Sequence, residues 1–315
     1  MSTPFANRLK KRARHLGKWA KRWPTQAYRV YDRDIPEYAW TVDVYGQDVY
    51  VQHFAQTPDE KRPQHDDVLE AIEQVLEPRS IALSQRLRQK GSAQYEKLDD
   101  RGRLSVVEED GLRFQVNLYD YIDTGLFLDH RAMRRMVGAD VKARAEGGRP
   151  LDVLNLFAYT CSFSVYAARH GARTHSVDLS NTYLEWGKRN FELNGMSVDD
   201  HAFERSDLLR WLPQATRRKR RYDVIVLDPP TFSRSKSMER DMDVQRDHVA
   251  LIEACITLLK PGGALYFSTN FQRFRLDEGF ADASCGAIWE EITARTISED
   301  FRTPIHRAWR ATRTP

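Results

Sequence analysis

The sequence predicts an α/β protein with a doubly wound, mostly parallel sheet of the Rossmann type, preceded by a small α+β region and a basic helix. From about residue 119 onward, short apolar stretches alternate with helical stretches that end at glycine, which is typical of strand–helix–strand units. Between about residues 27 and 118, alternating stretches flank glycine turns, which is typical of hairpins. The first 31 residues contain no acidic residue at all.

The chain up to residue 118 divides into two expected parts. Apolar residues recur every three or four positions from Phe5 to Trp23, which predicts a helix that ends at Pro24. We then expect a hairpin around Gly46, a helix, and a second strand pair around Asp110 and Gly111. The ranges are 39–50 for the hairpin, 66–76 for the helix, and 103–107 with 112–117 for the strand pair, with a polar loop over 58–64. The predicted domains are a basic helix (1–26), an RNA-binding or accessory α+β domain (27–118) and the Rossmann-like domain (119–315).

The last domain should contain seven strands separated mainly by helices. The expected strands are 151–157, 174–179, 201–204, 222–227, 264–269, 294–297 and 305–309. The expected helices are 162–170, 181–194, 207–215 and 244–259, with one more near the end of the chain. Open sheets of this kind bind ligands beyond the carboxyl ends of their strands, so the residues that follow each strand are the candidates for function.

Composition excludes several classes of protein. A chain of 315 residues with 41% hydrophobic and 30% charged residues fits a globular protein of about two domains. No apolar run approaches the roughly 18–20 residues of a membrane span, and the basic N-terminus has no apolar signal region. The three cysteines, Cys161, Cys255 and Cys285, have the spacing of neither a metal site nor a disulfide framework. We therefore expect a cytoplasmic protein without a bound metal or a membrane partner.

Positive charge is concentrated in two places although the net charge is only +4. One is the N-terminal helix, and the other is the run Arg217 to Arg221. Such patches in a nearly balanced chain favour a polyanionic partner. The helix residues that we expect to contact RNA are Arg8, Lys10, Lys11, Arg12, Lys18, Lys21 and Arg22. A solvated basic face on a packed helix is the alternative, and a membrane-surface helix is disfavoured because nothing else suggests lipid.

An apolar strand runs directly into Asp228, Pro229 and Pro230. Proline lacks the N–H and fixes φ, so the strand must end at Asp228 and leave its carboxylate at the edge of the sheet. The two prolines keep the following residues extended, with Phe232 close behind. A rigid, acidic loop that carries an aromatic residue suits a flat ring bearing an amine, although an ordinary strand-ending turn is an alternative.

Two further aspartates follow predicted strands. Asp178 could accept hydrogen bonds from the ribose hydroxyls of an adenosine, and Asp207, beside Leu208, could accept from the adenine amine. Each has an alternative role at a helix N-terminus. The turn after the first strand carries small residues (Ala158, Thr160, Cys161 and Ser162) and no G-x-G-x-x-G motif, which disfavours a dinucleotide oxidoreductase. The three acids together indicate an adenosine cofactor.

These motifs resemble one known family. The run Asn117 to Arg131, and most specifically Asp123 to Arg131, resembles the signature ahead of the cofactor domain in bacterial guanine-N7 methyltransferases of 23S rRNA, enzymes often fused to an N2-methylating partner. Other segments similar to that family are 6–11, 19–22, 155–164, 176–180, 228–233, 259–263 and 267–271. The resemblance covers nearly the whole chain.

The resemblance implies a seven-stranded methyltransferase sheet that uses S-adenosylmethionine (SAM). It places His130 and Arg131 by the methionine end of SAM, and Asp228, Pro229 and Pro230 near the transferred methyl. It also implies that further residues line the cofactor: Asn155, Phe157, Tyr159, Thr160, Asp178, Leu179, Ser180, Asp207 and Leu208. Cys161 stands where many relatives have glycine, and it would cost energy there if φ is positive. We expect neither an N2-methylating half nor an obligate protein partner.

The chemistry expected from these residues is methylation at guanine N7. Pyrimidine C5 methylation needs a cysteine thiolate, and the places where similar enzymes carry it hold Thr231–Ser233 and Ser268–Asn270. Guanine N7 has an in-plane lone pair and needs only alignment with the methyl donor. Asp228 could accept from the guanine N1–H or N2 amine, and Phe232 could stack on an extruded base, unless it packs in the core. Two alternatives stay open: methylation of guanine N2 or adenine N6, and a non-catalytic RNA-binding protein that keeps the fold.

Overall fold

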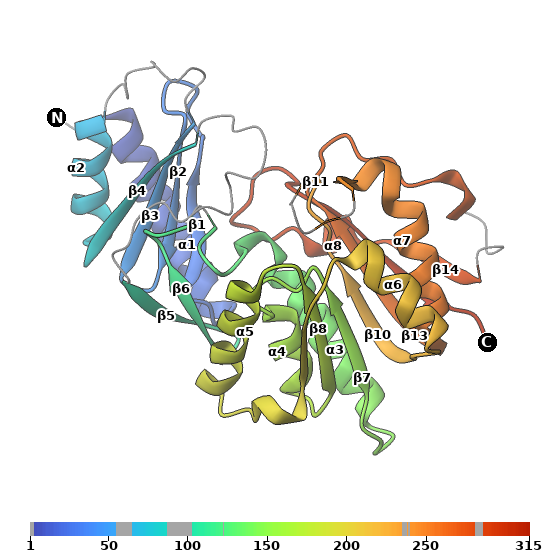
Figure 1. Ribbon diagram of the computed structural model, residues 1–315. Helices are drawn as coiled ribbons and strands as arrows, with labels where there is room; N and C mark the ends of the chain where they lie inside the picture. Colours follow the sequence, from blue (N-terminus) through green and yellow to red (C-terminus); the bar gives the residue numbers. More distant parts are fainter. Residues whose placement is uncertain are drawn as a thin grey trace. The chain divides into compact units, whose positions relative to one another are not determined.

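The computed structural model describes residues 3–54, 65–86, 103–121, 123–234, 238, 240–280 and 286–315. The chain forms two compact units (Figure 1), one made of Met1–Leu128 with Glu299–Arg302 and one of Asp129–Ser298 with Thr303–Pro315. The loop predicted over 58–64 lies outside the described residues. No helix among the described residues is long and apolar enough to span a bilayer.

The first unit packs two helices on a four-stranded sheet. Helix α1 (Pro4–Arg22) begins at Thr3, whose hydroxyl accepts from the amide of Ala6 at 3.1 Å, so the predicted N-terminal helix is confirmed. Its apolar face shares one core with α2 (His65–Leu76) and the sheet. The sheet order is β1-β2-β3-β4, with strands Ala27–Asp32, Trp40–Tyr45, Asp48–Phe54 and Ser80–Arg86; only β3 and β4 pair in parallel.

Both predicted hairpins are present. Strands β2 and β3 pair around Gly46, which has φ of 65°. Strands β5 (Leu104–Glu109) and β6 (Leu112–Asn117) pair around Asp110 and Gly111, with φ values of 56° and 74°. Two successive left-handed residues are what a tight hairpin turn requires, and Asp-Gly supplies them at low cost.

The second unit contains the predicted seven-stranded sheet, in the order β14-β15-β13-β10-β7-β8-β9. Its strands are β7 (Asp152–Leu156), β8 (Arg173–Asp178), β9 (Ala202–Arg205), β10 (Tyr222–Leu227), β13 (Leu259–Thr269), β14 (Ala287–Glu291) and β15 (Arg307–Arg313). Strands β7 to β10 and β13 are parallel, and β14 and β15 add an antiparallel edge. The order reverses between β7 and β10, which makes this point the expected ligand site.

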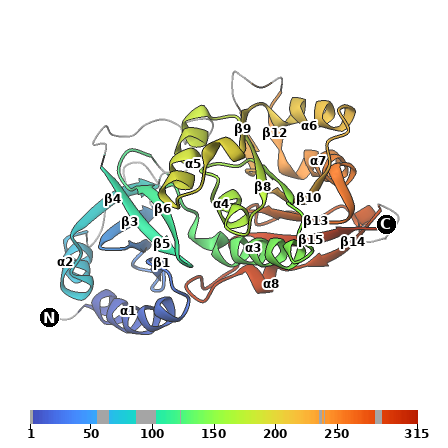
Figure 2. The same cartoon turned by 90° about the horizontal axis from the view of Figure 1, so that it is seen from below.

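Helices cover both faces of this sheet (Figure 2), with α3 on one side and α6 and α7 on the other. Val224 and Val226 of β10 belong to the core under α3 and α4, whereas Ile225 and Leu227 belong to the core under α6 and α7. The apolar run of β10 is therefore buried on both sides, as a central parallel strand requires. The helices are α3 (Arg131–Ala145), α4 (Ser162–Ala168), α5 (Asn181–Leu193), α6 (Leu208–Arg217) and α7 (Val244–Leu258).

Two predicted boundaries near the end of the chain were wrong. The strand expected over 294–297 is the short helix α8 (Thr293–Thr296), and the edge strand is β14 instead. Ile292 and Thr296 are both buried and lie four residues apart, so a single helical turn places both side chains on the buried side. Strand β13 also begins earlier than expected, at Leu259, because an irregularity around Gly262 and Gly263 lets the chain resume its pairing with β10.

Candidate active site at the carboxyl edge of the sheet

The three predicted aspartates lie at one edge of the sheet. Asp178 is the last residue of β8, Asp207 follows β9, and Asp228 follows β10. Because β8, β9 and β10 run parallel with β7 between β8 and β10, all three acids lie at the carboxyl edge. They therefore flank the point at which the strand order reverses.

The turn after β7 has an unusual backbone. Phe157, Tyr159 and Cys161 have φ values of 55°, 49° and 61°, so every second residue is left-handed without being glycine. A left-handed conformation costs a residue with a Cβ about 1–2 kcal/mol, so this turn holds backbone strain of the kind found at ligand sites. The positive φ considered for Cys161 in the sequence is confirmed.

Hydrogen bonds to β8 and α5 hold this strained turn in place. The amide of Tyr159 donates to Asp178 Oδ2 at 2.8 Å, and the side chain of Asn190 donates to the carbonyl of Thr160 at 2.9 Å. Asn155 is buried and donates to Ser164 Oγ at 2.9 Å, so it shapes the base of the turn.

Cys161 is packed tightly against helix α5. Its side chain is fully buried, and a Cβ added at Gly187 would lie 2.4 Å from its Sγ. Burial raises the pKa of the Cys161 thiol to about 12 and also raises the pKa of the Cys255 thiol. Both cysteines are therefore packed thiols rather than nucleophiles, and Cys285 lies outside the described residues.

Asp178 connects the turn to β8 and to the start of α5. Its Oδ1 accepts from the amide of Ser180 at 2.8 Å, and Ser180 itself caps α5. Burial raises the pKa of Asp178, although the amides of Ser180 and Tyr159 act in the opposite direction. The amide of Leu179 acts on the same carboxylate, whose two oxygens offer about four acceptor sites in all. Leu179 lies between Asp178 and Ser180 in the same turn.

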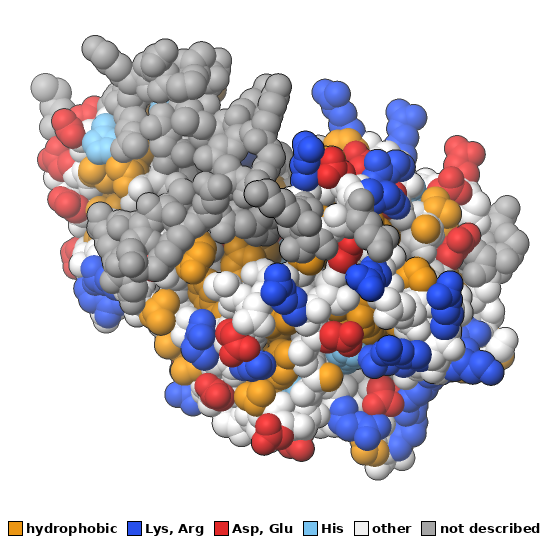
Figure 3. All heavy atoms as spheres, in the orientation of Figure 1, with side chains coloured by type: hydrophobic (Ala, Val, Ile, Leu, Met, Phe, Trp, Pro, Cys, Tyr) orange, Lys and Arg blue, Asp and Glu red, His pale blue; other side chains and the backbone are white. Residues whose placement is uncertain are grey.

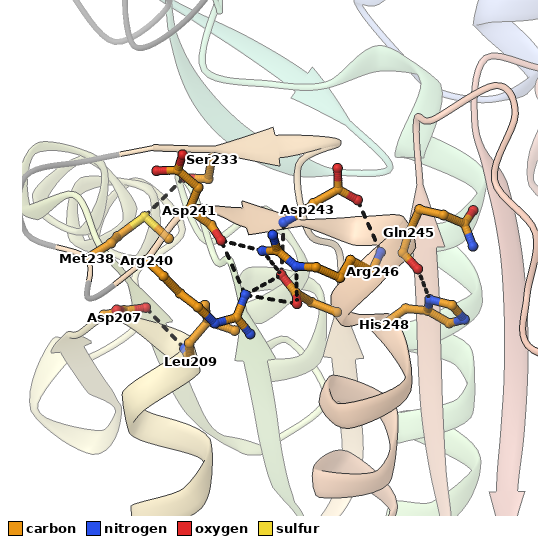
Figure 4. Close-up of polar contacts among 11 residues, drawn as sticks. Asp207, Leu209, Ser233, Met238, Arg240, Asp241, Asp243, Gln245, Arg246 and His248 are labelled. Atoms are coloured by element: carbon orange, nitrogen blue, oxygen red, sulfur yellow. Dashed lines mark hydrogen bonds and ion pairs between the residues drawn. The ribbon is translucent and has the colours of Figure 1, made fainter.

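Asp207 caps helix α6, as the alternative interpretation of the sequence had it. Its Oδ1 accepts from the amide of Leu209 at 3.1 Å (Figure 4). Leu208 is buried within the core under α6 and α7.

Asp228 lies in a cluster of buried polar side chains from four segments. Its Oδ1 accepts from Ser268 Oγ at 2.6 Å and lies 3.3 Å from His130 Nε2. His130 Nδ1 lies 3.0 Å from Asp129 Oδ2, which also accepts from His306 Nδ1 at 3.1 Å. Among the described residues, Asp228 Oδ2 receives no hydrogen bond, and 21% of the side chain is exposed.

Charge stabilises this cluster. Burial alone would lower the pKa of His130, but the carboxylates of Asp228 and Asp129 outweigh it and raise that pKa to about 10. Burial would likewise raise the pKa of Asp228 and of Asp129, but the charge of His130 holds both below the usual range. At neutral pH an imidazolium thus lies between two carboxylates.

The donor atoms of Asp129, His130 and His306 lie close enough to suggest a metal site. The two imidazole rings are stacked, however, with centroids 4.6 Å apart and planes 25° apart. A single ion cannot lie in the plane of both stacked rings, so the geometry favours a cluster held by ion pairs to His130 and by the hydrogen bond from His306 to Asp129.

Phe232 lies on a short arm beyond the two prolines. Pro229 is buried and Pro230 half-buried, whereas Phe232 is 44% exposed, so the interpretation of Phe232 as a core residue was wrong. The arm is a strand pair, β11 (Phe232–Ser233) with β12 (Met242–Asp243). Thr231 Oγ1 donates to Asn270 Oδ1 at 2.7 Å and connects the start of the arm to the end of β13.

One buried carboxylate anchors this arm to α7. Asp247 accepts from Arg240 at 2.9 and 3.0 Å, from Arg246 at 2.9 and 2.8 Å, and from the amide of Asp243 at 2.9 Å (Figure 4). Burial opposes ionisation of Asp247, but these donors outweigh it and lower its pKa to about 2. The arm that carries Phe232 is therefore fixed to α7 by these hydrogen bonds.

The predicted RNA-contacting residues divide into two groups. Arg8 and Arg12 form ion pairs with the buried Asp34, so they stabilise the first unit. The others are exposed on α1: Lys10, Lys11, Lys18, Lys21 and Arg22.

The run Arg217 to Arg221 lies at the opposite edge of the sheet from the three aspartates, because it leads from α6 into the start of β10. A hollow of about 510 Å³ at that amino edge, lined in part by His175, His201 and Arg220, is likewise separate from the site. Lys and Arg side chains are spread over the face of the second unit that Figure 3 displays, with acids between them.

Several residues of the site were not identified from the sequence. Asp129 and Ser268 fell inside recognised motifs but were given no role. His306 gave no signal, because it is a single histidine 177 residues from its partner Asp129. Arg131, by contrast, was expected by the methionine end of SAM, and it is buried next to His130 at the start of α3.

Comparison with known proteins identifies relatives over nearly the whole chain. A family model described as S-adenosylmethionine-dependent methyltransferase matches residues 70–284. Ribosomal RNA large subunit methyltransferase K of Neisseria meningitidis serogroup B is 47% identical over 98% of this chain and 86% of its own length. Ribosomal RNA large subunit methyltransferase K/L of Pseudomonas putida is 49% identical over 97% of this chain and 41% of its own length. The chain thus spans about two fifths of the K/L relatives.

Solved structures share the fold. SMU.776, solved in complex with SAH, superposes with a TM-score of 0.76 and 23% identity over 98% of this chain and 80% of that one. The SAM-dependent methyltransferase from Agrobacterium tumefaciens gives a TM-score of 0.61 and 19% identity over 88% of each chain. At these identities the likeness extends to the fold alone.

Proposed function

The chain belongs to the S-adenosylmethionine-dependent methyltransferase family, and on that premise we propose that it transfers the methyl group of SAM to N7 of a guanine in 23S ribosomal RNA. One observation carries the choice of a base as the acceptor. Asp228 has one anchored oxygen and one that receives no hydrogen bond from the described residues, close in sequence to the exposed Phe232. The ribosomal RNA methyltransferases among the relatives support RNA as the substrate.

The residues at the carboxyl edge fit the cofactor. Asp178 and Asp207 offer carboxylate oxygens at neighbouring strand ends, as the hydroxyls and amine of an adenosine require. The strained turn 157–161 brings backbone amides close to that edge. We assign Asp178 to the ribose, Asp207 to the adenine, and Phe157, Tyr159 and Thr160 to the wall of the site. When bound, SAM supplies an electrophilic methyl group.

The protein's part in the reaction is to position the base. Asp228 Oδ2 accepts from guanine N1–H or N2–H, Phe232 stacks on the ring, and N7 faces the donor. Positioning of this kind lowers a barrier by up to about 7–11 kcal/mol without a general base. Methylation leaves positive charge on the guanine ring, which the Asp228 carboxylate stabilises.

The two alternatives differ in what they require of Asp228. Methylation of guanine N2 or adenine N6 releases a proton, and Asp228 is a weak base because its pKa lies below the usual range. A non-catalytic RNA-binding protein would need no bound SAM.

Calorimetry with SAM and tritium transfer to a 23S rRNA fragment separate these cases. We expect micromolar-range SAM binding together with methyl transfer. RNA binding without methyl transfer would contradict the proposal.

We further propose that Asn270 reads guanine. Its Oδ1 accepts from Thr231, which leaves the amide N–H₂ to donate to guanine O6, an acceptor adjacent to N1–H. Asn270→Asp replaces that donor with an acceptor, so kcat/KM for a guanine-containing RNA should fall about 10- to 100-fold. SAM affinity, measured in parallel, should not change. Unaltered kcat/KM in Asn270→Asp would exclude this contact.

We also propose that α1 and the first unit bind the RNA backbone in the cytoplasm. Replacing Lys10, Lys11 and Lys18 by Gln should reduce the slope of log affinity against log salt by about 0.7–0.9 for each phosphate that α1 no longer neutralises. Arg12→Gln should instead lower the unfolding temperature, because Arg12 pairs with the buried Asp34. An unchanged salt slope in the triple variant would locate the RNA-binding surface elsewhere.

A further inference from the structure

We propose that Asp129 and His306 are positioning residues that hold His130 as an imidazolium, which in turn fixes Asp228 toward the substrate base. This inference deepens the proposed function and rests on it.

The geometry places His130 between two acids. Its Nδ1 lies 3.0 Å from Asp129 Oδ2 and its Nε2 lies 3.3 Å from Asp228 Oδ1. Neutral imidazole has one N–H, so it can donate to only one carboxylate and would turn a lone pair toward the other. Only the protonated ring places positive charge against both carboxylates as an ion pair, and its side chain is just 7% exposed.

Asp129 is itself held from the other side. Its Oδ2 accepts from His306 Nδ1 at 3.1 Å, and His306 Nε2 lies 2.9 Å from Thr296 Oγ1 of α8. The His306 side chain is completely buried. The segment ahead of β15 thereby fixes the carboxylate that keeps His130 charged.

Charged and aromatic groups face the His130 ring. They include the two carboxylates, the stacked ring of His306, and the ring of Phe163, which meets it edge-on at 5.9 Å. Burial alone would lower the pKa of His130, but the two carboxylates raise it to about 10. The ring thus stays charged from acid to mildly alkaline pH.

The consequence for the reaction lies in Asp228. Ser268 and His130 both hold Oδ1, so the carboxylate cannot rotate freely and Oδ2 keeps a fixed direction. If His130 lost its proton at Nε2, a lone pair would face Oδ1 and displace it. Reaction rate should therefore follow the protonation of His130.

The test is the pH–rate profile of methyl transfer in variants of the full chain. Wild-type kcat should be nearly flat from about pH 6 to 9 and fall near pH 10. Asp129→Asn removes one carboxylate, so the pH at which kcat falls on the alkaline side should decrease by about one to three units. A two-unit shift leaves about a tenth of the activity at pH 9.

His130→Gln keeps an N–H that does not titrate, so it should retain partial activity with a flat alkaline limb, whereas His306→Leu should lower kcat.

A second readout is independent of activity. In ¹⁵N-histidine NMR of the unliganded protein, the His130 signal is assigned as the one missing from His130→Gln. At pH 8 this signal should report a protonated ring in wild type and a neutral ring in Asp129→Asn. A wild-type His130 that titrates between pH 6 and 7, or superimposable profiles of wild type and Asp129→Asn, would overturn the inference. Methylation at an atom other than guanine N7 would contradict the proposed function while leaving the NMR result standing.

Discussion

Asp228→Asn is expected to lower kcat for methyl transfer by about 100- to 1000-fold, the usual effect of removing one preorganised charged group from an active site. The substitution keeps the shape of the side chain but removes its charge. The acceptor for guanine is weakened, and the buried His130 loses one of its two carboxylates. The measurement is single-turnover transfer from tritiated SAM to a 23S rRNA fragment, with SAM saturating.

Asp199→Asn is the matched control for this change. Asp199 is an exposed acid at the amino edge of the sheet, far along the strands from Asp228. The control should react at the wild-type rate. Equal rates for Asp228→Asn and wild type would remove Asp228 from the reaction.

Gly187→Ala is expected to destabilise the protein by about 3 kcal/mol, the upper range for overpacking a buried site. The new Cβ would lie 2.4 Å from Cys161 Sγ and 2.9 Å from its Cβ, so the helix and the strained turn cannot both keep their positions. Urea unfolding measures the loss. SAM affinity should fall as well, because the turn 157–161 would move.

A double-mutant cycle separates this clash from a general effect on α5. Cys161→Gly removes the colliding atoms and the strain at φ of 61°, so the Cys161→Gly, Gly187→Ala protein should regain most of the stability. Gly17→Ala on α1 is the control, since a Cβ there meets nothing within 4 Å and should stabilise by up to about 1 kcal/mol. Additive effects at residues 161 and 187 would show that the two do not compete for space.

Local pattern was sufficient for most of the fold. An apolar run followed by two prolines predicts the strand that ends at Asp228. The dipeptide Asp110-Gly111, which suits left-handed φ, predicts the hairpin turn. The failure at 294–297 has a physical reason, since a run of four residues fits one helical turn as well as a strand.

The site was only partly predictable because its decisive contacts are non-local. The motif contains Asp129 and His130, but His306, which donates to Asp129, lies just ahead of a strand at the end of the chain. Likewise, the pairing of Arg8 with Asp34 depends on how α1 lies against the sheet, which composition alone does not show. A positive φ was considered only at Cys161; the left-handed residues Phe157 and Tyr159 were hidden because glycine does not mark their positions.

The most direct measurement is mass-spectrometric mapping of the nucleoside that the purified protein methylates in 23S rRNA. The account predicts 7-methylguanosine at a defined position, formed with SAM by wild type and strongly reduced with Asp228→Asn after the same reaction time. A methyl group on an exocyclic amine, or unmodified RNA from a protein that binds both SAM and RNA, would contradict it.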